Sequence, residues 1–559
     1  MSYSVKKFNN FREALEETTE KFGDRPAYYL KEKEGGEYYP LTYKQYKHDI
    51  NSLGTALIDM GLKGKRIAVI GENRYEWAVT YLATVNGVGC IVPLDKSLPE
   101  YELESLLRRS EVSSIFFTDN NKEAIMNISK RINTIKHYVS MSEGDPDNNI
   151  LDFKRVLLRG EALLKNSNTK YTGAEINNEE MSVLMFTSGT TDVAKGVMLS
   201  HKSICADIEG FQANTKMDEN DVFLSILPLH HIFGSVAELL NAMFLGASIG
   251  YCEGLTKIAK NLQELKPTIF ACVPGIVEMM YKQIWNGLEE SGEKEQIQAI
   301  LGKGDLTIEK SREIFKDIYA MLGGRLNMFI VAGAPVAPAT LKGFRDFGIY
   351  AMAGYGLTEI SGASVGNRID NYKDEAIGLT FPNMETKIDN PNEEGIGEIL
   401  QKSPSLMLGY YKNEEATKNA IKDGWLYTGD LGYMDDDGFI VVTGRKKNVI
   451  VLKNGKNVFP EEMEPTLGLN KYIKDCIIFE RRTGKDDVIN IEIGTSIVPN
   501  IEIIERELGK MEKEEILNIL KKEVKTFNET LPDYKIITYV EIREEEFEKT
   551  PSGKIKRYI

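Results

Sequence analysis

The stretch MFTSGTTDVAKGVMLSH (185–201) contains the small residues, hydroxyls and lysine that a phosphate-binding loop requires. The phosphate loop of kinases and GTPases has glycine, four residues, Gly-Lys and then Ser or Thr, and it opens directly into a helix. Here four residues separate Gly189 from Ala-Lys-Gly (194–196), and a β-like apolar run (197–199) follows. Ser200 is a good N-cap for a helix that begins only after it. We therefore expect a loop between two strands, which offers backbone N–H groups, hydroxyls and a lysine to a triphosphate but no helix N-terminus.

Four further stretches carry residues that could do chemistry. GYGLTE (354–359) combines an aromatic ring, glycines, a hydroxyl and a carboxylate, and WLYTGDLG (425–432) is expected to place Asp430 in a tight turn where it can hold a ribose diol. GRKKN (444–448) is a charged segment, and KTPSGKIKR (549–557) presents a lysine between Pro/Gly and the C-terminus. Each alone is also typical of an ordinary turn, N-cap, charged hinge or frayed tail. We interpret all five stretches, in this order, as one constellation.

The elements that must position these stretches alternate between strand and helix. Strands are predicted at 66–73, 89–95 and 113–119, with helices at 76–87 and 99–110 between them. The same rhythm returns with predicted strands at 221–229, 267–274 and 326–333. Such alternation predicts βαβ units and a parallel sheet. The charged stretch 285–322 between the last two strands is predicted to be a helical insertion on the surface.

The alternation of strands and helices ends near residue 380. METKIDN (384–390), GEILQKS (397–403) and GFIVVTG (438–444) read as short strands separated by turns, which is typical of a small β-subdomain. The remainder returns to mixed α and β and contains the helical pattern of 514–531. We therefore predict an α/β protein with one domain at 1–444 and a second at 445–559.

Composition excludes several classes of protein. The 559 residues are 42% hydrophobic and 27% charged, as in ordinary globular proteins, and the net charge of −15 argues against nucleic acid or an anionic membrane as the main partner. Five scattered cysteines fit a reducing compartment and no common zinc pattern. No signal peptide and no transmembrane segment are recognisable, so a cytoplasmic location is expected. Peripheral contact with a membrane and the oligomeric state stay open.

The order of the five stretches resembles the adenylate-forming superfamily, which includes acyl-CoA synthetases, luciferases and the adenylation domains of peptide synthetases. The resemblance covers roughly residues 10–559. It implies a large N-terminal domain of two sheet-based subdomains plus a β-subdomain, and a small mobile α+β C-terminal domain that rotates between two half-reactions. It also implies ATP, Mg²⁺, coenzyme A as co-substrate and a small-molecule carboxylic acid.

The phosphate loop departs from the usual family form, TSGTTG followed by two residues and KG. This chain has Asp192 in place of the last glycine and Ala194 in place of a common proline. Aspartate has less φ freedom than glycine and adds negative charge beside a triphosphate. We expect the substitution to affect the path of the loop and its affinity for ATP.

By resemblance, the nucleotide site would be built from all five stretches. The residues expected at the β and γ phosphates are Thr187, Ser188, Gly189, Thr190, Thr191 and Lys195. Thr358 would contact the α-phosphate and Glu359 the Mg²⁺. The residues expected around the adenosine are Gly333, Ala334, Pro335 and Tyr355 for adenine, with Asp430 and Arg445 for ribose. Lys554 would reach the α-phosphate and carboxylate oxygens, and we expect it to be catalytic together with Glu359, Thr358, Thr187 and Lys195.

The second half-reaction needs a thiol. The segment 451–464, with Lys453, Gly455 and Lys456, resembles the part of the family that lines the pantetheine tunnel after the rotation. Lys447 falls on the hinge position of the family.

The acid is expected to bind beside 227–249, with His231 at the mouth of the pocket and Gly354 and Gly356 in its wall. Gly356 stands where acetate-specific relatives carry tryptophan, so an open pocket is expected. The region 273–285 with its following insertion resembles the long-chain fatty acyl-CoA synthetase branch. We predict activation of a medium- to long-chain fatty acid and its transfer to coenzyme A. The alternatives are acyl or aryl transfer to a carrier-protein pantetheine and a non-catalytic nucleotide-binding homologue.

Overall fold

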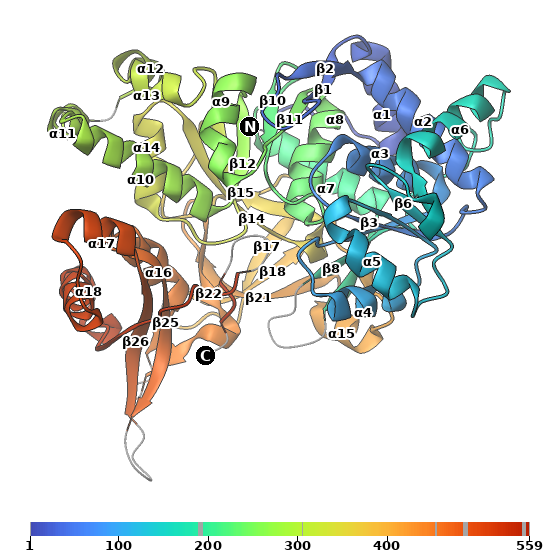
Figure 1. Ribbon diagram of the computed structural model, residues 1–559. Coiled ribbons are helices and arrows are strands. Elements are labelled where there is room, and N and C mark those ends of the chain that lie inside the picture. The colour runs from blue at the N-terminus through green and yellow to red at the C-terminus, as the bar shows by residue number, and fades with distance from the viewer. Residues whose placement is uncertain are drawn as a thin grey trace.

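The computed structural model describes residues 2–187, 194–304, 306–452, 456–483, 490–549 and 555–557. Two α/β units lie side by side, a smaller β unit lies beside them, and the C-terminal unit, coloured orange to red, lies next to the green helix α10 (Pro274–Glu290) (Figure 1). The predicted α/β class, with two sheet-based subdomains, a β-subdomain and a smaller C-terminal α+β unit, is confirmed. Within the described ranges, no helix combines the length and the apolar character that crossing a bilayer requires.

The first sheet has eight strands in the order β19-β9-β8-β4-β3-β5-β6-β7. Their bounds are β3 (Arg66–Ile70), β4 (Cys90–Leu94), β5 (Ser114–Phe117), β6 (His137–Ser140), β7 (Ile150–Asp152), β8 (Met181–Thr187), β9 (Lys195–Ser200) and β19 (Gly409–Tyr410). The pairs from β8 to β7 are parallel, whereas β9 runs antiparallel to both β8 and β19. The predicted strands at 66–73, 89–95 and 113–119 are confirmed as β3, β4 and β5. The three segments are continuous apolar runs because helices cover both faces of a parallel sheet, so the side chains of its strands are buried.

The second sheet has nine strands in the order β16-β15-β14-β13-β12-β10-β11-β1-β2. Their bounds are β1 (Pro26–Leu30), β2 (Tyr39–Thr42), β10 (Val222–Ser225), β11 (Ser248–Tyr251), β12 (Ile269–Cys272), β13 (Met328–Val331), β14 (Tyr350–Leu357), β15 (Gly362–Gly366) and β16 (Leu379–Thr380). The pairs from β14 to β1 are parallel, and β2, β15 and β16 add antiparallel edges. The predicted strands at 221–229, 267–274 and 326–333 are confirmed as β10, β12 and β13.

Helices cover both faces of the two sheets, with one large core between the sheets and a further core on the outer face of each. Those of the N-terminal part are α1 (Phe11–Phe22), α2 (Tyr43–Asp59), α3 (Tyr75–Ala83), α4 (Glu100–Ser110), α5 (Lys122–Ser129), α6 (Phe153–Lys165), α7 (His201–Asn214), α8 (Asn241–Leu245), α9 (Ile258–Leu265), α10 and α14 (Pro338–Asp346). The predicted helical insertion is confirmed as α11 (Lys294–Leu301), α12 (Ile308–Ile314) and α13 (Lys316–Met321).

The β-subdomain is a five-stranded antiparallel sheet with a small core of Val365, Ile399 and Ile440. Its strands are β17 (Glu385–Asp389), β18 (Gly397–Lys402), β20 (Ile421–Lys422), β21 (Trp425–Met434) and β22 (Ile440–Arg445), and α15 (Glu414–Ala420) precedes β20. The strands predicted at 384–390, 397–403 and 438–444 are therefore confirmed.

The C-terminal unit has its own hydrophobic core. Its elements are β23 (Ile450–Val451), β24 (Asn457–Val458), α16 (Pro460–Gly468), β25 (Ile473–Thr483), β26 (Asn490–Pro499), α17 (Ile501–Leu508), α18 (Lys513–Asn528) and β27 (Tyr539–Ile542). It rests on α10, where Lys282 Nζ donates a hydrogen bond to the carbonyl of Gly468 (2.6 Å). Arg506 and Glu290 add an ion pair of 3.3 Å between the same two parts.

Candidate active site

The loops at the carboxyl ends of parallel strands from both sheets contact one another. Asn73, just after β3, donates to the carbonyl of Leu227 (2.6 Å) and accepts from the N–H of Leu229 (3.1 Å), in the loop after β10. Asp95, just after β4, lies 3.8 Å from Nε2 of His230 in the same loop. Ligands of open α/β sheets bind outside the carboxyl ends of the strands. This edge is therefore where the sequence-predicted residues should assemble.

The phosphate loop is framed by two paired strands, as predicted. Thr187 ends β8 and pairs with Lys195, the first residue of the antiparallel β9, and Thr187 Oγ1 donates to the carbonyl of Lys195 (3.4 Å). Ser200 caps α7 by accepting from the N–H of Ser203 (3.1 Å), which confirms the predicted N-cap. The remaining predicted phosphate ligands and the unusual aspartate lie outside the described residues: Ser188, Gly189, Thr190, Thr191 and Asp192.

Glu359 and Lys195 are brought together by a residue that the sequence analysis did not assign, Tyr410. Thr358 is buried at the end of β14 and begins a single 3₁₀ turn, η6 (Thr358–Ile360), which carries Glu359. The hydroxyl of Tyr410 donates to Glu359 Oε1 (2.8 Å), and Lys195 Nζ lies 5.2 Å from the centre of the Tyr410 ring. The carbonyl of Glu359 accepts from the N–H of Met407 (2.9 Å), which ties the segment leading to Tyr410 to the turn.

Glu359 has the chemistry of a ligand for the Mg²⁺ that accompanies ATP. Among the described residues its Oε2 has no hydrogen-bond partner, while Oε1 is oriented by Tyr410. Mg²⁺ is commonly bound by one or two carboxylates together with substrate phosphates, rather than by an all-protein cage. The described ranges contain no group of three or more His, Cys, Asp or Glu side chains that could hold a metal ion.

Tyr355, Arg445 and the buried Asp430 form a polar cluster between the second sheet and the β-subdomain. The hydroxyl of Tyr355 donates to Asp430 Oδ2 (2.7 Å), and Arg445 Nε lies 2.8 Å from Asp430 Oδ1. Burial raises the pKa of the Tyr355 phenol, and the Asp430 carboxylate raises it further, so Tyr355 remains a donor. Because each carboxylate oxygen can accept more than one hydrogen bond, Asp430 keeps capacity for a diol.

The predicted tight turn at Asp430 is wrong. Asp430 lies inside β21, where it pairs with Arg445 of β22, and β21 also pairs with β18 on its other side. Gly429 has φ 72°, and the pairing registers shift on either side of Asp430. The glycines of WLYTGDLG therefore mark β-bulges in a continuous strand, which re-aim side chains without ending the pairing.

The structure explains two of the three glycines that are predicted to lie near adenine or the acid. Gly333, with Ala334 and Pro335, begins two residues after the end of β13, and its φ of 92° requires glycine. A Cβ on Gly356 would come 1.7 Å from the carbonyl oxygen of Gly362, so the pairing of β14 with β15 already requires a glycine there. A Cβ on Gly354 would meet nothing closer than 3.7 Å, so packing does not explain its lack of a side chain.

The loop after β10 presents two neutral histidines. Burial lowers the pKa of His231 to about 4, with a further contribution from His230, and burial also lowers the pKa of His230. His231 Nδ1 accepts from the N–H of Phe233 (3.3 Å), which leaves Nε2 as the protonated nitrogen at neutral pH. Behind the loop, Ser225 Oγ donates to the fully buried Glu238 (2.6 Å) in the π-helical segment η4 (Phe233–Leu240). The backbone of the loop therefore orients the His231 ring through Nδ1, and its role at the mouth of an acid pocket stays a prediction.

The predicted hinge residue, Lys447, lies in a single 3₁₀ turn, η7 (Lys446–Asn448), directly after β22. Its neighbour Lys446 pairs with Glu398 Oε2 of the β-subdomain (3.0 Å), and Asn448 donates to Glu461 of α16 in the C-terminal unit. The side chains on either side of Lys447 are therefore anchored to different parts of the molecule.

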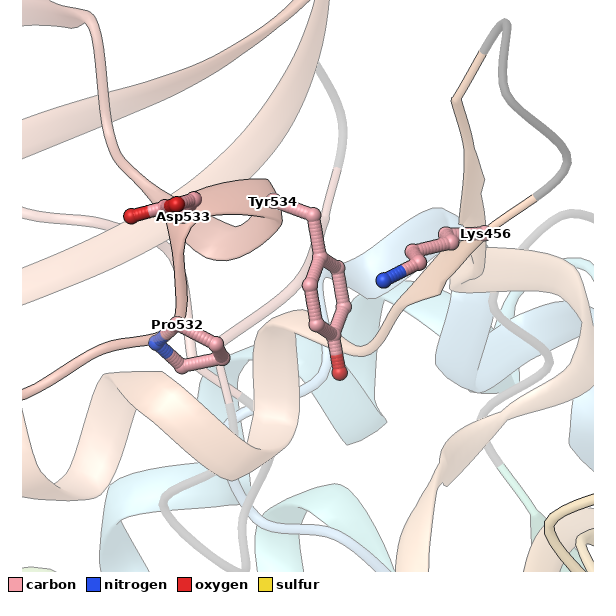
Figure 2. A pocket seen from close by; sticks show the side chains of 4 residues that line it. All are labelled: Lys456, Pro532, Asp533 and Tyr534. Atoms are coloured by element: carbon pink, nitrogen blue, oxygen red, sulfur yellow. The ribbon is translucent and has the colours of Figure 1, made fainter.

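The C-terminal unit contributes a pocket of about 540 Å³ lined by Lys456, Pro532, Asp533 and Tyr534 (Figure 2). Lys456 Nζ lies 4.2 Å from the centre of the Tyr534 ring. The family resemblance predicts Lys456 as part of the thiol-substrate site, and the structure adds Tyr534 beside it. The other predicted residues of this unit, Lys453, Gly455 and Lys554, lie outside the described residues.

The fold and this site define a protein of the adenylate-forming class. The AMP-binding enzyme family matches residues 15–411, and the AMP-binding enzyme C-terminal domain matches residues 447–558. The chain therefore belongs to the AMP-binding enzyme family.

Similar proteins of known name agree with this assignment. Long chain acyl-CoA synthetase 3 of Arabidopsis thaliana is 31% identical over 77% of this chain and 70% of its own length. Fatty acyl-CoA synthetase B of Dictyostelium discoideum is 26% identical over 84% of this chain and 74% of its own. The crystal structure of the anthranilate CoA ligase AuaEII in complex with anthranoyl-AMP matches the fold with a TM-score of 0.78, at 20% identity, and covers 99% of this chain and 96% of that one.

Replacing Asp430 with asparagine is expected to weaken ATP binding about 30-fold. The substitution keeps the shape of the side chain but removes the charge-assisted hydrogen bonds to a ribose diol and leaves Arg445 without its partner, a loss of roughly 2 kcal/mol. Calorimetric titration with ATP would measure it, and thermal unfolding would separate binding from stability. Asp437→Asn is the matched control, because it removes a carboxylate charge that pairs with Lys373 instead (2.6 Å). Wild-type affinity in Asp430→Asn would contradict a ribose role for this carboxylate.

Proposed function

We propose that this protein activates a medium- to long-chain fatty acid with ATP and transfers it to coenzyme A. In the first half-reaction a carboxylate oxygen of the acid attacks the α-phosphorus of ATP, pyrophosphate leaves, and an acyl-adenylate forms. In the second, the thiol of coenzyme A attacks the acyl carbon and AMP leaves. The observation that carries the proposal is that curated long-chain acyl-CoA synthetases align with most of the chain, the Arabidopsis relative at 31% identity over 77% of it.

The charges of the site suit the first half-reaction. Both reactants are anions, so the main requirement is positive charge and hydrogen-bond donors directed at the transferring phosphoryl group. Lys195, at the end of the phosphate loop, and Arg445, beside Asp430, are cations of this kind among the described residues. Lys554 supplies a third in the proposal. Thr187, Thr358 and the hydroxyl-rich loop between Thr187 and Lys195 supply neutral donors.

The proposed acid is aliphatic, with a chain longer than that of acetate. Gly354 supports this proposal. A Cβ at this position would fit at ordinary contact distances, so the glycine leaves room that a longer acyl chain can use. The proposal places the reaction in the cytoplasm, and all five cysteines are free of disulfides. Incubation with ATP, Mg²⁺, coenzyme A and an equimolar mixture of acetate, octanoate, palmitate and benzoate tests the substrate class. We expect octanoyl- or palmitoyl-CoA to dominate in mass spectra, and benzoyl-CoA as the main product would overturn it.

The pocket of Lys456 and Tyr534 is proposed to take part of coenzyme A. An aromatic ring beside an ammonium group is suited to an adenine base and a phosphate. Lys456→Ala is therefore expected to raise the KM for coenzyme A about tenfold, the equivalent of roughly 1.4 kcal/mol, without slowing pyrophosphate release in the absence of coenzyme A. The matched control is Lys535→Ala, which removes a neighbouring lysine that is paired with Glu462 (2.6 Å). Equal KM values for both variants and the wild type would remove the pocket from the proposal.

A further inference from the structure

Tyr410 occupies a central place in the nucleotide site that the motifs did not indicate. It lies in β19, an edge strand that pairs with β9, with Tyr410 opposite Val197. Its backbone N–H donates to Thr417 Oγ1 (2.9 Å), and its side chain is almost fully buried. The residue is therefore fixed in both backbone and side chain.

Tyr410 contacts both the cation and the carboxylate on which adenylation is proposed to depend. Lys195 Nζ is 5.2 Å from the ring centre, and the hydroxyl donates to Glu359 Oε1 at 2.8 Å. No ion pair links Lys195 to Glu359 in the part of the chain that the structure describes. An ion pair between Lys195 and Glu359 would neutralise the two charges that should serve the phosphates and the Mg²⁺. A cation over an aromatic face and a carboxylate at a phenol hydroxyl are both stabilised without meeting.

Burial raises the pKa of the Tyr410 phenol, and Glu359 raises it further, so the hydroxyl remains a donor throughout the physiological range. A hydrogen bond to one carboxylate oxygen fixes the orientation of the other. Partners that orient metal ligands in this way typically change metal affinity 10- to 100-fold when they are removed.

We propose that Tyr410 is a positioning residue of the adenylation centre: its hydroxyl orients Glu359 toward the Mg²⁺ of Mg-ATP, and its ring holds the ammonium of Lys195 away from that carboxylate. The inference rests on the proposed function for the roles of Glu359 and Lys195. The alternative is a core tyrosine whose hydroxyl simply needed a partner. The two differ in one respect, because only a positioning role couples Tyr410 to the metal.

The test is ATP binding by calorimetry, with Mg²⁺ and with EDTA, for the wild type, Tyr410→Phe and Tyr410→Leu. Tyr410→Phe keeps the ring and loses the donor, so we expect about tenfold weaker binding with Mg²⁺ and unchanged binding in EDTA. Tyr410→Leu removes the aromatic ring as well, so in the proposal Lys195 becomes free to pair with Glu359, and binding in EDTA should also weaken several-fold. Tyr411→Phe is the matched control, since the Tyr411 hydroxyl contacts Glu111 instead (3.0 Å).

Two results for Tyr410→Phe would overturn the inference: an equal loss of ATP affinity with and without Mg²⁺, or no loss of affinity at all. Should the Tyr410 variants unfold at the assay temperature, Glu359→Gln provides the second measurement. The inference requires that variant to lose the Mg²⁺ dependence of ATP binding, and retention of the dependence would overturn it. No acid is present in these titrations, so they test the role of Tyr410 separately from the acid substrate. A protein that binds Mg-ATP as expected but activates no fatty acid would contradict the proposed function and leave this inference standing.

Discussion

Lys554→Ala should abolish most acyl-adenylate formation and leave thioester formation from supplied adenylate close to normal. In the proposed reaction the lysine contacts the α-phosphate and carboxylate oxygens only during adenylation. Removing one preorganised charged donor from a transition state of this kind typically lowers the rate about 100- to 1,000-fold. Pyrophosphate release measures the first half-reaction, and synthetic acyl-adenylate with coenzyme A isolates the second.

A nearby lysine supplies the control for this prediction. Lys556, on the same segment, is 3.6 Å from Glu548 and has no assigned role, so Lys556→Ala should run both half-reactions at wild-type rates. If Lys554→Ala loses both half-reactions together, the lysine does not act specifically in adenylation. If it loses neither, the catalytic role is wrong.

Lys447→Pro should remove one half-reaction and spare the other. The residue lies between Lys446, anchored to Glu398, and Asn448, anchored to Glu461, so a rotation of the C-terminal unit has to pass through its backbone. Hinges are short segments that absorb large φ/ψ changes. Proline fixes φ near about −65° and restricts the preceding residue, so it should permit one arrangement of the two parts and exclude the other.

A second variant distinguishes the role of the Lys447 backbone from that of its side chain. Lys447→Ala keeps backbone freedom and removes the charge, so it should run both half-reactions. The same two assays as for Lys554 apply, and loss of either single half-reaction in the proline variant agrees with a hinge. A proline variant that runs both half-reactions at normal rates would contradict a hinge at Lys447.

Much of the fold could be predicted because its signals are local. The apolar runs of β3, β4 and β5 are buried on both faces of a parallel sheet, so their sequence carries no alternation that could be misread. Ser200 was recognisable as an N-cap because capping depends on the first turn alone. The strand-to-strand phosphate loop followed from the apolar run after Lys195.

The errors and omissions of the sequence analysis arise from long-range pairing. Asp430 appeared to sit in a turn because two glycines flank it, yet two neighbouring strands hold it in β21, and no local pattern reveals that pairing. Tyr410 was missed because it meets Glu359 and Lys195 only in the folded chain. The resemblance predicts an open pocket from Gly356, whereas the close approach of Gly362 gives a separate reason for the glycine.

Pyrophosphate release from ATP and a series of acids, with and without coenzyme A, tests the central claim most directly. With octanoate or palmitate, the account predicts a single-turnover burst without coenzyme A, because the acyl-adenylate stays bound, and continuous release when coenzyme A is added. Acetate and benzoate should give little in either case. Absence of pyrophosphate with every acid, from a protein that binds ATP, would contradict adenylation. A burst that coenzyme A does not convert into turnover would contradict coenzyme A as the acceptor.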